Sequence, residues 1–219
     1  LVEVLKRALQ DRPEFQGATV TDKLGAALPT RRPYDSAVAP GYVAVGDAAA
    51  HVNPTTGGGI PGAAKAGHWA AEVAAEAISA GDVSEAALWA YNERVQTGFG
   101  KRFAAMDLYN IFGSAHEVDE LTDVVTALPG EMLVDLLGKQ GTASLTFGEK
   151  VRSTLATAVK TRGHWSTLYE AYRVNKLATR LKDIYEEYPD SPAGFDDWRA
   201  ERDAFMDEVY EVTGAEPKY

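Results

Sequence analysis

The chain has 219 residues, of which 45% are hydrophobic, and this suits one sizeable packed domain or two small ones. It contains no cysteine, which excludes disulfides, thiolate metal sites and a cysteine nucleophile, and its four histidines show no close metal-ligand spacing. The net charge of -10 disfavours nucleic acid as a partner, and no apolar run is long enough to cross a bilayer.

The first part of the chain predicts a helix, an extended segment and a loop. Apolar residues recur at helical spacing from Leu1 to Leu9, and Pro13 ends the pattern. Residues 18–28 predict one strand or a bent hairpin arm. Residues 29–41 hold three prolines and predict a connecting loop. Because the chain starts at leucine without a signal peptide, we interpret it as beginning inside a longer protein.

A strand, a glycine-dense polar loop and two helices are predicted next. The valine-rich run at 42–47 is typical of a strand buried on both faces of a parallel sheet. Residues 60–81 predict a helix with a proline in its first turn and a glycine at its end. Asp82 and Glu85 suggest a capping box for the next predicted helix, 84–112.

The remainder predicts helices separated by glycine-containing turns. These predicted helices are 117–127, 130–140, 147–161, 164–187 and 195–213. Aromatic residues at helical spacing favour a core between packed helices over a lipid cavity. They are Trp165, Tyr169, Tyr172, Tyr185, Tyr188, Trp198, Phe205 and Tyr210.

Negative charge is concentrated at the end of the chain. Residues 183–219 hold twelve Asp and Glu against three Lys and Arg. Such a run is typical of solvated helical faces, and it is also compatible with a salt-rich cytoplasm, where excess carboxylates keep proteins soluble.

One stretch, GYVAVGDAAAHVNPTTGGGIPGAAKAG, carries the chemistry. A strand would deliver Asp47 to the carboxyl end of a sheet, where its carboxylate can accept hydrogen bonds from ribose or ribityl hydroxyls. Pro54 stiffens the following loop, and Gly57, Gly58 and Gly59 let the backbone approach a ligand closely. The amides at the start of the next helix favour negative charge on a phosphate or on a reduced flavin.

The sequence VGDAAAHVNPTTGGGI resembles the "GDAAH…P…G.G" motif of flavoproteins built like aromatic hydroxylases and geranylgeranyl reductases. The resemblance implies that Asp47 binds the ribityl chain of FAD and that the proline and glycine loop lies against the isoalloxazine ring and the pyrophosphate. The cofactor-binding residues that it implies are Gly46, Asp47, Pro54, Gly57, Gly58, Gly59 and Ile60.

The variant NPTTGGGI, followed by an alanine-rich helix, is similar to the geranylgeranyl reductase branch. That family reduces isoprenoid double bonds, and its archaeal members saturate the chains of digeranylgeranylglycerol phospholipids. The acidic composition fits a halophilic archaeal member of this lipid-biosynthesis group.

The resemblance implies an α/β remnant of an FAD-binding fold of the two-dinucleotide-binding type, followed by a mostly α-helical C-terminal region. We expect residues 1–28 to end a substrate or catalytic-sheet domain, 29–100 to complete the FAD-binding domain, and 101–219 to form a helical domain. The GxGxxG fingerprint that binds the ADP part of FAD is missing from the chain, so we expect a fragment that lacks most of the flavin site; the alternative is a chain that has lost the dinucleotide site.

The leading hypothesis is therefore an FAD-dependent reductase acting on C=C bonds of an isoprenoid lipid, with NAD(P)H or ferredoxin as the external electron donor. We expect it in the cytoplasm, with at most peripheral contact at the inner membrane face. No catalytic residue can be named. The alternatives are an FAD-dependent monooxygenase of the aromatic-hydroxylase type and a non-enzymatic acidic helical interaction module.

For three further side chains the sequence allows two interpretations each. His51 either touches the flavin or is a satisfied loop histidine. Arg31 and Arg32 either contact a phosphate or form surface ion pairs, and the ion pairs are favoured.

Overall fold

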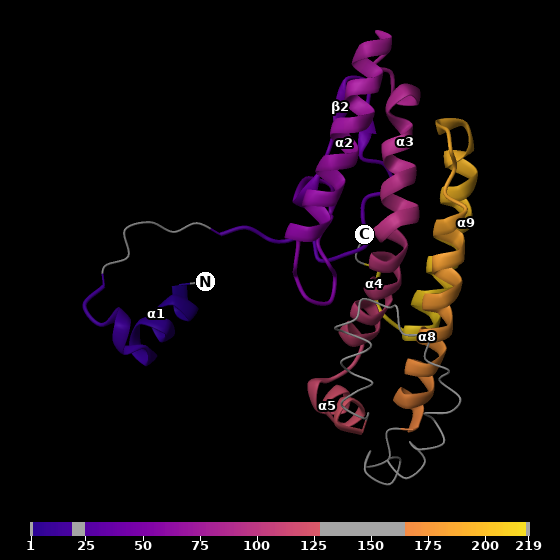
Figure 1. Cartoon of the computed structure of the whole chain (residues 1–219). Helices are drawn as coiled ribbons and strands as arrows, with labels where there is room; N and C mark the ends of the chain where they lie inside the picture. Colours follow the sequence, from indigo (N-terminus) through magenta and orange to yellow (C-terminus); the bar gives the residue numbers. More distant parts are fainter. Residues whose placement is uncertain (1, 19–24, 128–164, 218–219) are drawn as a thin grey trace.

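The computed structural model describes residues 2–18, 25–127 and 165–217, and these are mostly helical (Figure 1). Helix α1 (Val2–Asp11) confirms the first predicted helix and lies apart from the main helical body in Figure 1. Pro13 opens a short 3-10 turn, η1 (Pro13–Phe15). Of the strand predicted at 18–28, the described residues form no strand, and 19–24 lie outside the described part.

A small antiparallel hairpin forms the sheet of the described residues. Strand β1 (Val38–Ala39) pairs with β2 (Tyr42–Val43), with Val38 opposite Val43. The prediction of a parallel strand buried on both faces is therefore wrong, and Tyr42 is 57% exposed. Gly41, at φ +71°, reverses the chain, so β2 pairs with the segment directly before it, which was predicted to be all loop.

Helix α2 (Ile60–Ala80) confirms the prediction for this segment. Gly81 ends it in the left-handed conformation, at φ 70°, and its N–H donates to the carbonyls of the last turn. A glycine takes this conformation without the steric cost of a Cβ, and for this reason a glycine after a helical pattern predicts the end of the helix.

The next helical rod is continuous over three segments: α3 (Glu85–Val95), a π-helical turn η3 (Gln96–Gly100) and α4 (Lys101–Ser114). The predicted capping box is wrong, because Ser84 is the N-cap and accepts the N–H of Ala87 at 3.3 Å. Asp82 instead accepts the N–H of Ser84 at 2.9 Å.

The last helices pack against this rod. The structure gives α5 (Val118–Ala127), α8 (Trp165–Glu186), the short turn η4 (Pro192–Gly194) and α9 (Phe195–Thr213). Helix α8 contacts both α4 and α9, and α8 and α9 lie beside the α3–α4 rod in Figure 1. The predictions at 117–127, 164–187 and 195–213 are confirmed, whereas those at 130–140 and 147–161 lie outside the described residues.

Aromatic side chains form much of the core between these helices. Trp89 stacks on Tyr188 with ring centroids 5.8 Å apart, and Tyr188 meets Trp198 edge to face at 4.7 Å. The core prediction is confirmed for the buried members Tyr185, Tyr188, Trp198 and Phe205. It is wrong for Tyr169, which is 64% exposed.

Two ion pairs, one buried and one partly buried, attach the segment before the hairpin to the helices. Arg32 pairs with Asp107 of α4 at 3.4 Å, and both side chains are almost fully buried. Arg202 of α9 donates from both terminal nitrogens to the carboxylate of Asp35, one bond measuring 2.6 Å. Arg32 is thus in an ion pair, but in the interior and not at the surface as predicted, because α4 covers it.

Two amide side chains of the rod hold the same segment from another side. Asn92 accepts the N–H of Ala37 at 2.8 Å, and one turn later Gln96 donates to the carbonyl of Tyr34 at 2.7 Å. Both amides are buried, so these bonds are formed away from water. The segment that leads into the hairpin therefore has a fixed path over the rod.

The proposed division at residues 28 and 100 stays a prediction. The helical rod passes through position 100 without a break. None of the described helices is long and apolar enough to cross a membrane.

Candidate functional site

The predicted site begins at a tight turn after the hairpin. Residues Gly46–Ala49 form the 3-10 turn η2, and Gly46 has φ +63°. Ala50 closes the turn in the left-handed conformation, at φ 56°, and its N–H donates to the carbonyl of Asp47 at 3.1 Å. A positive φ is uncommon for a residue with a Cβ, so neighbouring contacts must hold this backbone.

Asp47 lies on this turn with its side chain exposed. Its Oδ1 lies 3.3 Å from the point that a Cβ on Gly59 would occupy, so the carboxylate stands directly beside the start of α2. Among the described residues, no hydrogen bond or ion pair occupies the Asp47 carboxylate. The structure thus leaves Asp47 as a hydrogen-bond acceptor open to a ligand.

The loop between the turn and α2 is organised by Asn53. Its side-chain oxygen accepts the N–H groups of Thr55 at 2.9 Å and Thr56 at 3.1 Å. Its own N–H donates to Gly58 at 3.0 Å, and its carbonyl accepts from Gly57 at 2.9 Å. The loop is therefore closed on itself before any ligand binds, and an Asx-type turn of this kind is typical of asparagine.

Helix α2 starts without a side-chain cap. Gly59 occupies the N-cap position, Pro61 stands in the first turn, and Ile60 is 85% exposed. Uncapped first-turn amides give the end of a helix a partial positive charge that favours anions. Gly62 lets this first turn approach the preceding loop, because a Cβ there would stand 2.6 Å from the carbonyl oxygen of His51.

His51 itself is buried at 1% exposure, beneath the turn. Burial lowers its pKa to about 4, so the imidazole is neutral at physiological pH. Its Nδ1 accepts the N–H of Gly46 at 3.2 Å, which places the ring proton on Nε2. Its ring meets Phe99 edge to face, with centroids 5.1 Å apart.

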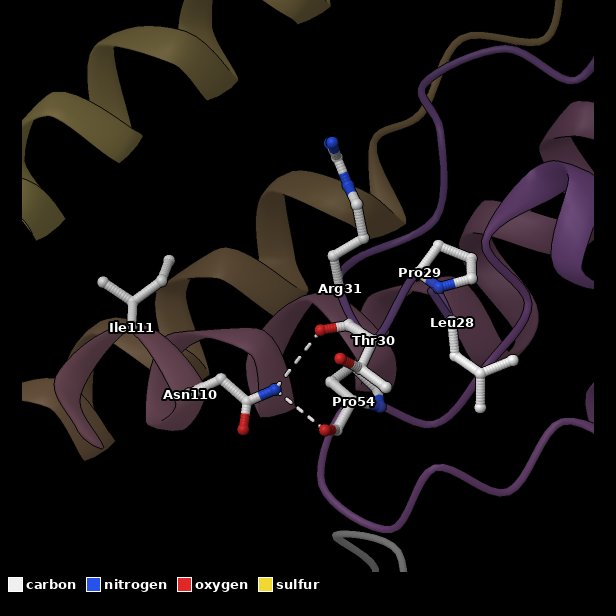
Figure 2. Close-up of a pocket in the computed structure, with 7 residues that line it drawn as sticks. All are labelled: Leu28, Pro29, Thr30, Arg31, Pro54, Asn110 and Ile111. Carbon is white, nitrogen blue, oxygen red and sulfur yellow. Dashed lines mark hydrogen bonds between the residues drawn. The ribbon is translucent and has the colours of Figure 1, made fainter. Parts of the chain in front are cut away.

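A pocket of about 510 Å³ lies on the other side of the loop, between residues 28–31, Pro54 and helix α4 (Figure 2). Asn110 of α4 donates to the carbonyl of Pro54 at 2.8 Å and to that of Thr30 at 3.5 Å, so it joins the two walls. Leu28, Pro29, Pro54 and Ile111 make much of the lining apolar. In Figure 2 the side chain of Arg31 extends away from Asn110 and Pro54.

The structure thus brings part of the predicted set together. Asp47 lies beside Gly59, and Gly46 lies near α2, because its Cβ position is 3.4 Å from the Cβ of Ala63. Pro54 is buried and bonded through its carbonyl to Asn110. The sequence analysis did not identify Asn110. The feature that could have pointed to it is a polar residue directly before an isoleucine in an otherwise apolar stretch of helix.

Comparison with known proteins gives one consistent group of relatives. No family model matches the chain. It is 27% identical over 198 residues, 90% of its length, to the digeranylgeranylglycerophospholipid reductase of Sulfolobus acidocaldarius, and covers 43% of that protein. It is 34% identical over 169 residues, 74% of its length, to digeranylgeranylglycerophospholipid reductase 2 of Methanopyrus kandleri, and covers 42% of that protein.

A shorter match has higher identity. The chain is 41% identical over 90 residues, 41% of its length, to digeranylgeranylglycerophospholipid reductase 1 of Methanococcoides burtonii, of which it covers 22%. The chain spans less than half the length of the curated relatives that it matches.

Proposed function

The chain belongs to the geranylgeranyl reductase family, and from this we propose that the whole protein is an FAD-dependent reductase that saturates isoprenoid double bonds of membrane lipids. The observation that carries the proposal is the exposed Asp47 carboxylate at the uncapped start of α2. The names of the relatives support a lipid as the substrate.

The residues present fit a flavin. The side chain of Asp47 has an acceptor available for a ribityl hydroxyl, and the first turn of α2 has no side-chain cap that would compete with a ligand. Gly59 leaves the space beside the carboxylate unfilled, since a Cβ there would stand 3.3 Å from Oδ1. These features support a two-dinucleotide-binding-type FAD site to which this chain contributes the Asp47 side.

When bound, the flavin would supply a hydride to one carbon of the double bond, and a proton would be needed at the other carbon to complete the saturation. The residues of this chain bind and orient it: Asp47 accepts a hydroxyl hydrogen bond, and the amides of the first turn of α2 favour its anionic parts. The closed loop around Asn53 presents this arrangement with little ordering left to do on binding.

The pocket beside Pro54, whose apolar residues stand next to Thr30, Arg31 and Asn110, offers a place near this loop for part of the lipid. The electron donor that reduces the flavin is proposed to be NAD(P)H or ferredoxin. We propose that the whole protein meets its lipid by peripheral contact at the cytoplasmic face of the membrane, with apolar contacts dominating, because the negative net charge repels anionic headgroups.

The test is flavin retention by variants of the whole protein. Asp47→Ala removes the acceptor and is expected to weaken FAD binding by about 5- to 150-fold, equivalent to about 1–3 kcal/mol for a hydroxyl left without its partner. Glu76→Ala, which removes an exposed carboxylate of α2, is the matched control and should bind FAD as the wild type does. Undiminished flavin affinity in Asp47→Ala would contradict the assignment.

A further inference from the structure

Two hydrogen bonds between Gly46 and His51 close the turn that carries Asp47. The N–H of Gly46 donates to Nδ1 of His51 at 3.2 Å, and the N–H of His51 donates back to the carbonyl of Gly46 at 3.0 Å. Asp47 lies inside the turn that these two bonds close. A single side chain therefore contributes to the backbone geometry that presents the carboxylate.

His51 is itself held firmly. Its side chain is 1% exposed, and its ring packs edge to face on Phe99 in the π-helical turn η3. Its carbonyl oxygen lies under the first turn of α2, at 2.6 Å from the Cβ position of Gly62. The same residue thus contacts the Asp47 turn, the start of α2 and the helical rod.

A backbone conformation in this turn needs such support. Ala50 lies directly before His51. Among the described residues, it is the one residue other than glycine with a positive φ. A conformation of this kind is strained and persists only where surrounding contacts determine it. The bond from Gly46 to Nδ1 is the side-chain contact that ties the start of this turn to its end.

We propose that His51 is a positioning residue for the flavin site: its neutral Nδ1 accepts the Gly46 N–H and so holds the Asp47 carboxylate at the start of α2. This inference rests on the proposed function, in which Asp47 binds FAD. His51 acts through the turn and not by contact with the cofactor, since its ring is enclosed by protein. Its lowered pKa agrees with this role, because a protonated imidazole has no acceptor at Nδ1.

The chain offers an isosteric pair of variants for the test. Asparagine places an oxygen at the branch where Nδ1 stands, so His51→Asn keeps an acceptor for Gly46, whereas His51→Leu has the same shape and no acceptor. Both lose the ring contact with Phe99. In the whole protein we expect His51→Leu to weaken FAD binding about tenfold and His51→Asn to stay within about threefold, from the usual worth of one hydrogen bond.

Equal FAD affinity of the two variants would overturn the inference. The Asp47→Ala variant, measured beside them, separates this failure from that of the proposed function: if Asp47→Ala binds FAD normally, the proposed function fails. If Asp47→Ala is impaired and the His51 pair shows no difference, only the inference fails.

A second measurement does not depend on the variants folding. Nitrogen-15 NMR of the wild-type histidines should show His51 with Nδ1 unprotonated and the proton on Nε2 at neutral pH. A protonated Nδ1 at neutral pH would overturn the inference on its own.

Discussion

Gly62→Ala is the substitution that tests most simply how α2 is placed against the Asp47 turn. In an ordinary helical position alanine is favoured over glycine by about 1 kcal/mol. At position 62 the new Cβ would stand 2.6 Å from the carbonyl oxygen of His51, a contact that backbone must relieve by moving. Overpacking of this kind costs about 1–3 kcal/mol, so the gain in helix propensity is cancelled or reversed.

Gly67→Ala is the matched control on the same helix. The Cβ position of Gly67 has no heavy atom within 4 Å, so alanine there meets no obstacle. We expect Gly67→Ala to raise the melting temperature by about 2–4 °C, the usual equivalent of 1 kcal/mol for a domain of this size. Gly62→Ala should instead leave it unchanged or lower it by several degrees.

The assay is thermal unfolding of the chain followed by circular dichroism, with both variants measured in the same buffer. In the whole protein, Gly62→Ala should also weaken FAD binding, because the start of α2 moves relative to Asp47. If Gly62→Ala and Gly67→Ala raised the melting temperature equally, the close approach between α2 and the carbonyl of His51 would be refuted.

Three further outcomes are expected. Arg202→Met leaves the partly exposed Asp35 carboxylate with only Arg199, at 3.8 Å, and should cost about 1–3 kcal/mol by urea unfolding. A loss below about 0.5 kcal/mol would contradict a structural role for the pair. The pKa of His51 is about 4 in the folded chain against 6.5 ordinarily, so the unfolded state takes up the proton first. Stability should therefore fall as the pH drops from about 6.5 to 4, by up to about 3 kcal/mol, and His51→Asn should remove this part of the slope. The excess of acidic residues in 183–219 predicts a melting temperature that rises between low and molar salt, and a flat or falling one would contradict it.

Helices were predictable because their signals are local. The predicted helix 195–213 coincides with α9, and the place of Gly81 after an alanine-rich run correctly predicts the end of α2. The valine-rich run at 42–47 predicts a strand but not its pairing partner, and the predicted parallel pairing is therefore wrong. The signal for the hairpin was present in the Pro40-Gly41 dipeptide that precedes β2.

The candidate site divides in the same way. The motif order pointed to Asp47 and the glycines, because each has a local reason to stand there. Some supports of the site join residues far apart in the chain: Asn110 donates to the carbonyls of Pro54 and Thr30. No local pattern identifies the partner of a buried polar side chain, so these bonds appear only when the fold is known.

The most direct test of the central claim is reduction of a lipid by the whole protein loaded with FAD. A phospholipid bearing geranylgeranyl chains, supplied with the reduced enzyme, should gain H2 at its double bonds by mass spectrometry, and Asp47→Ala should lose this activity together with its flavin. Hydroxylation of a small phenol with no change in the unsaturated lipid would contradict the reductase assignment and favour a monooxygenase.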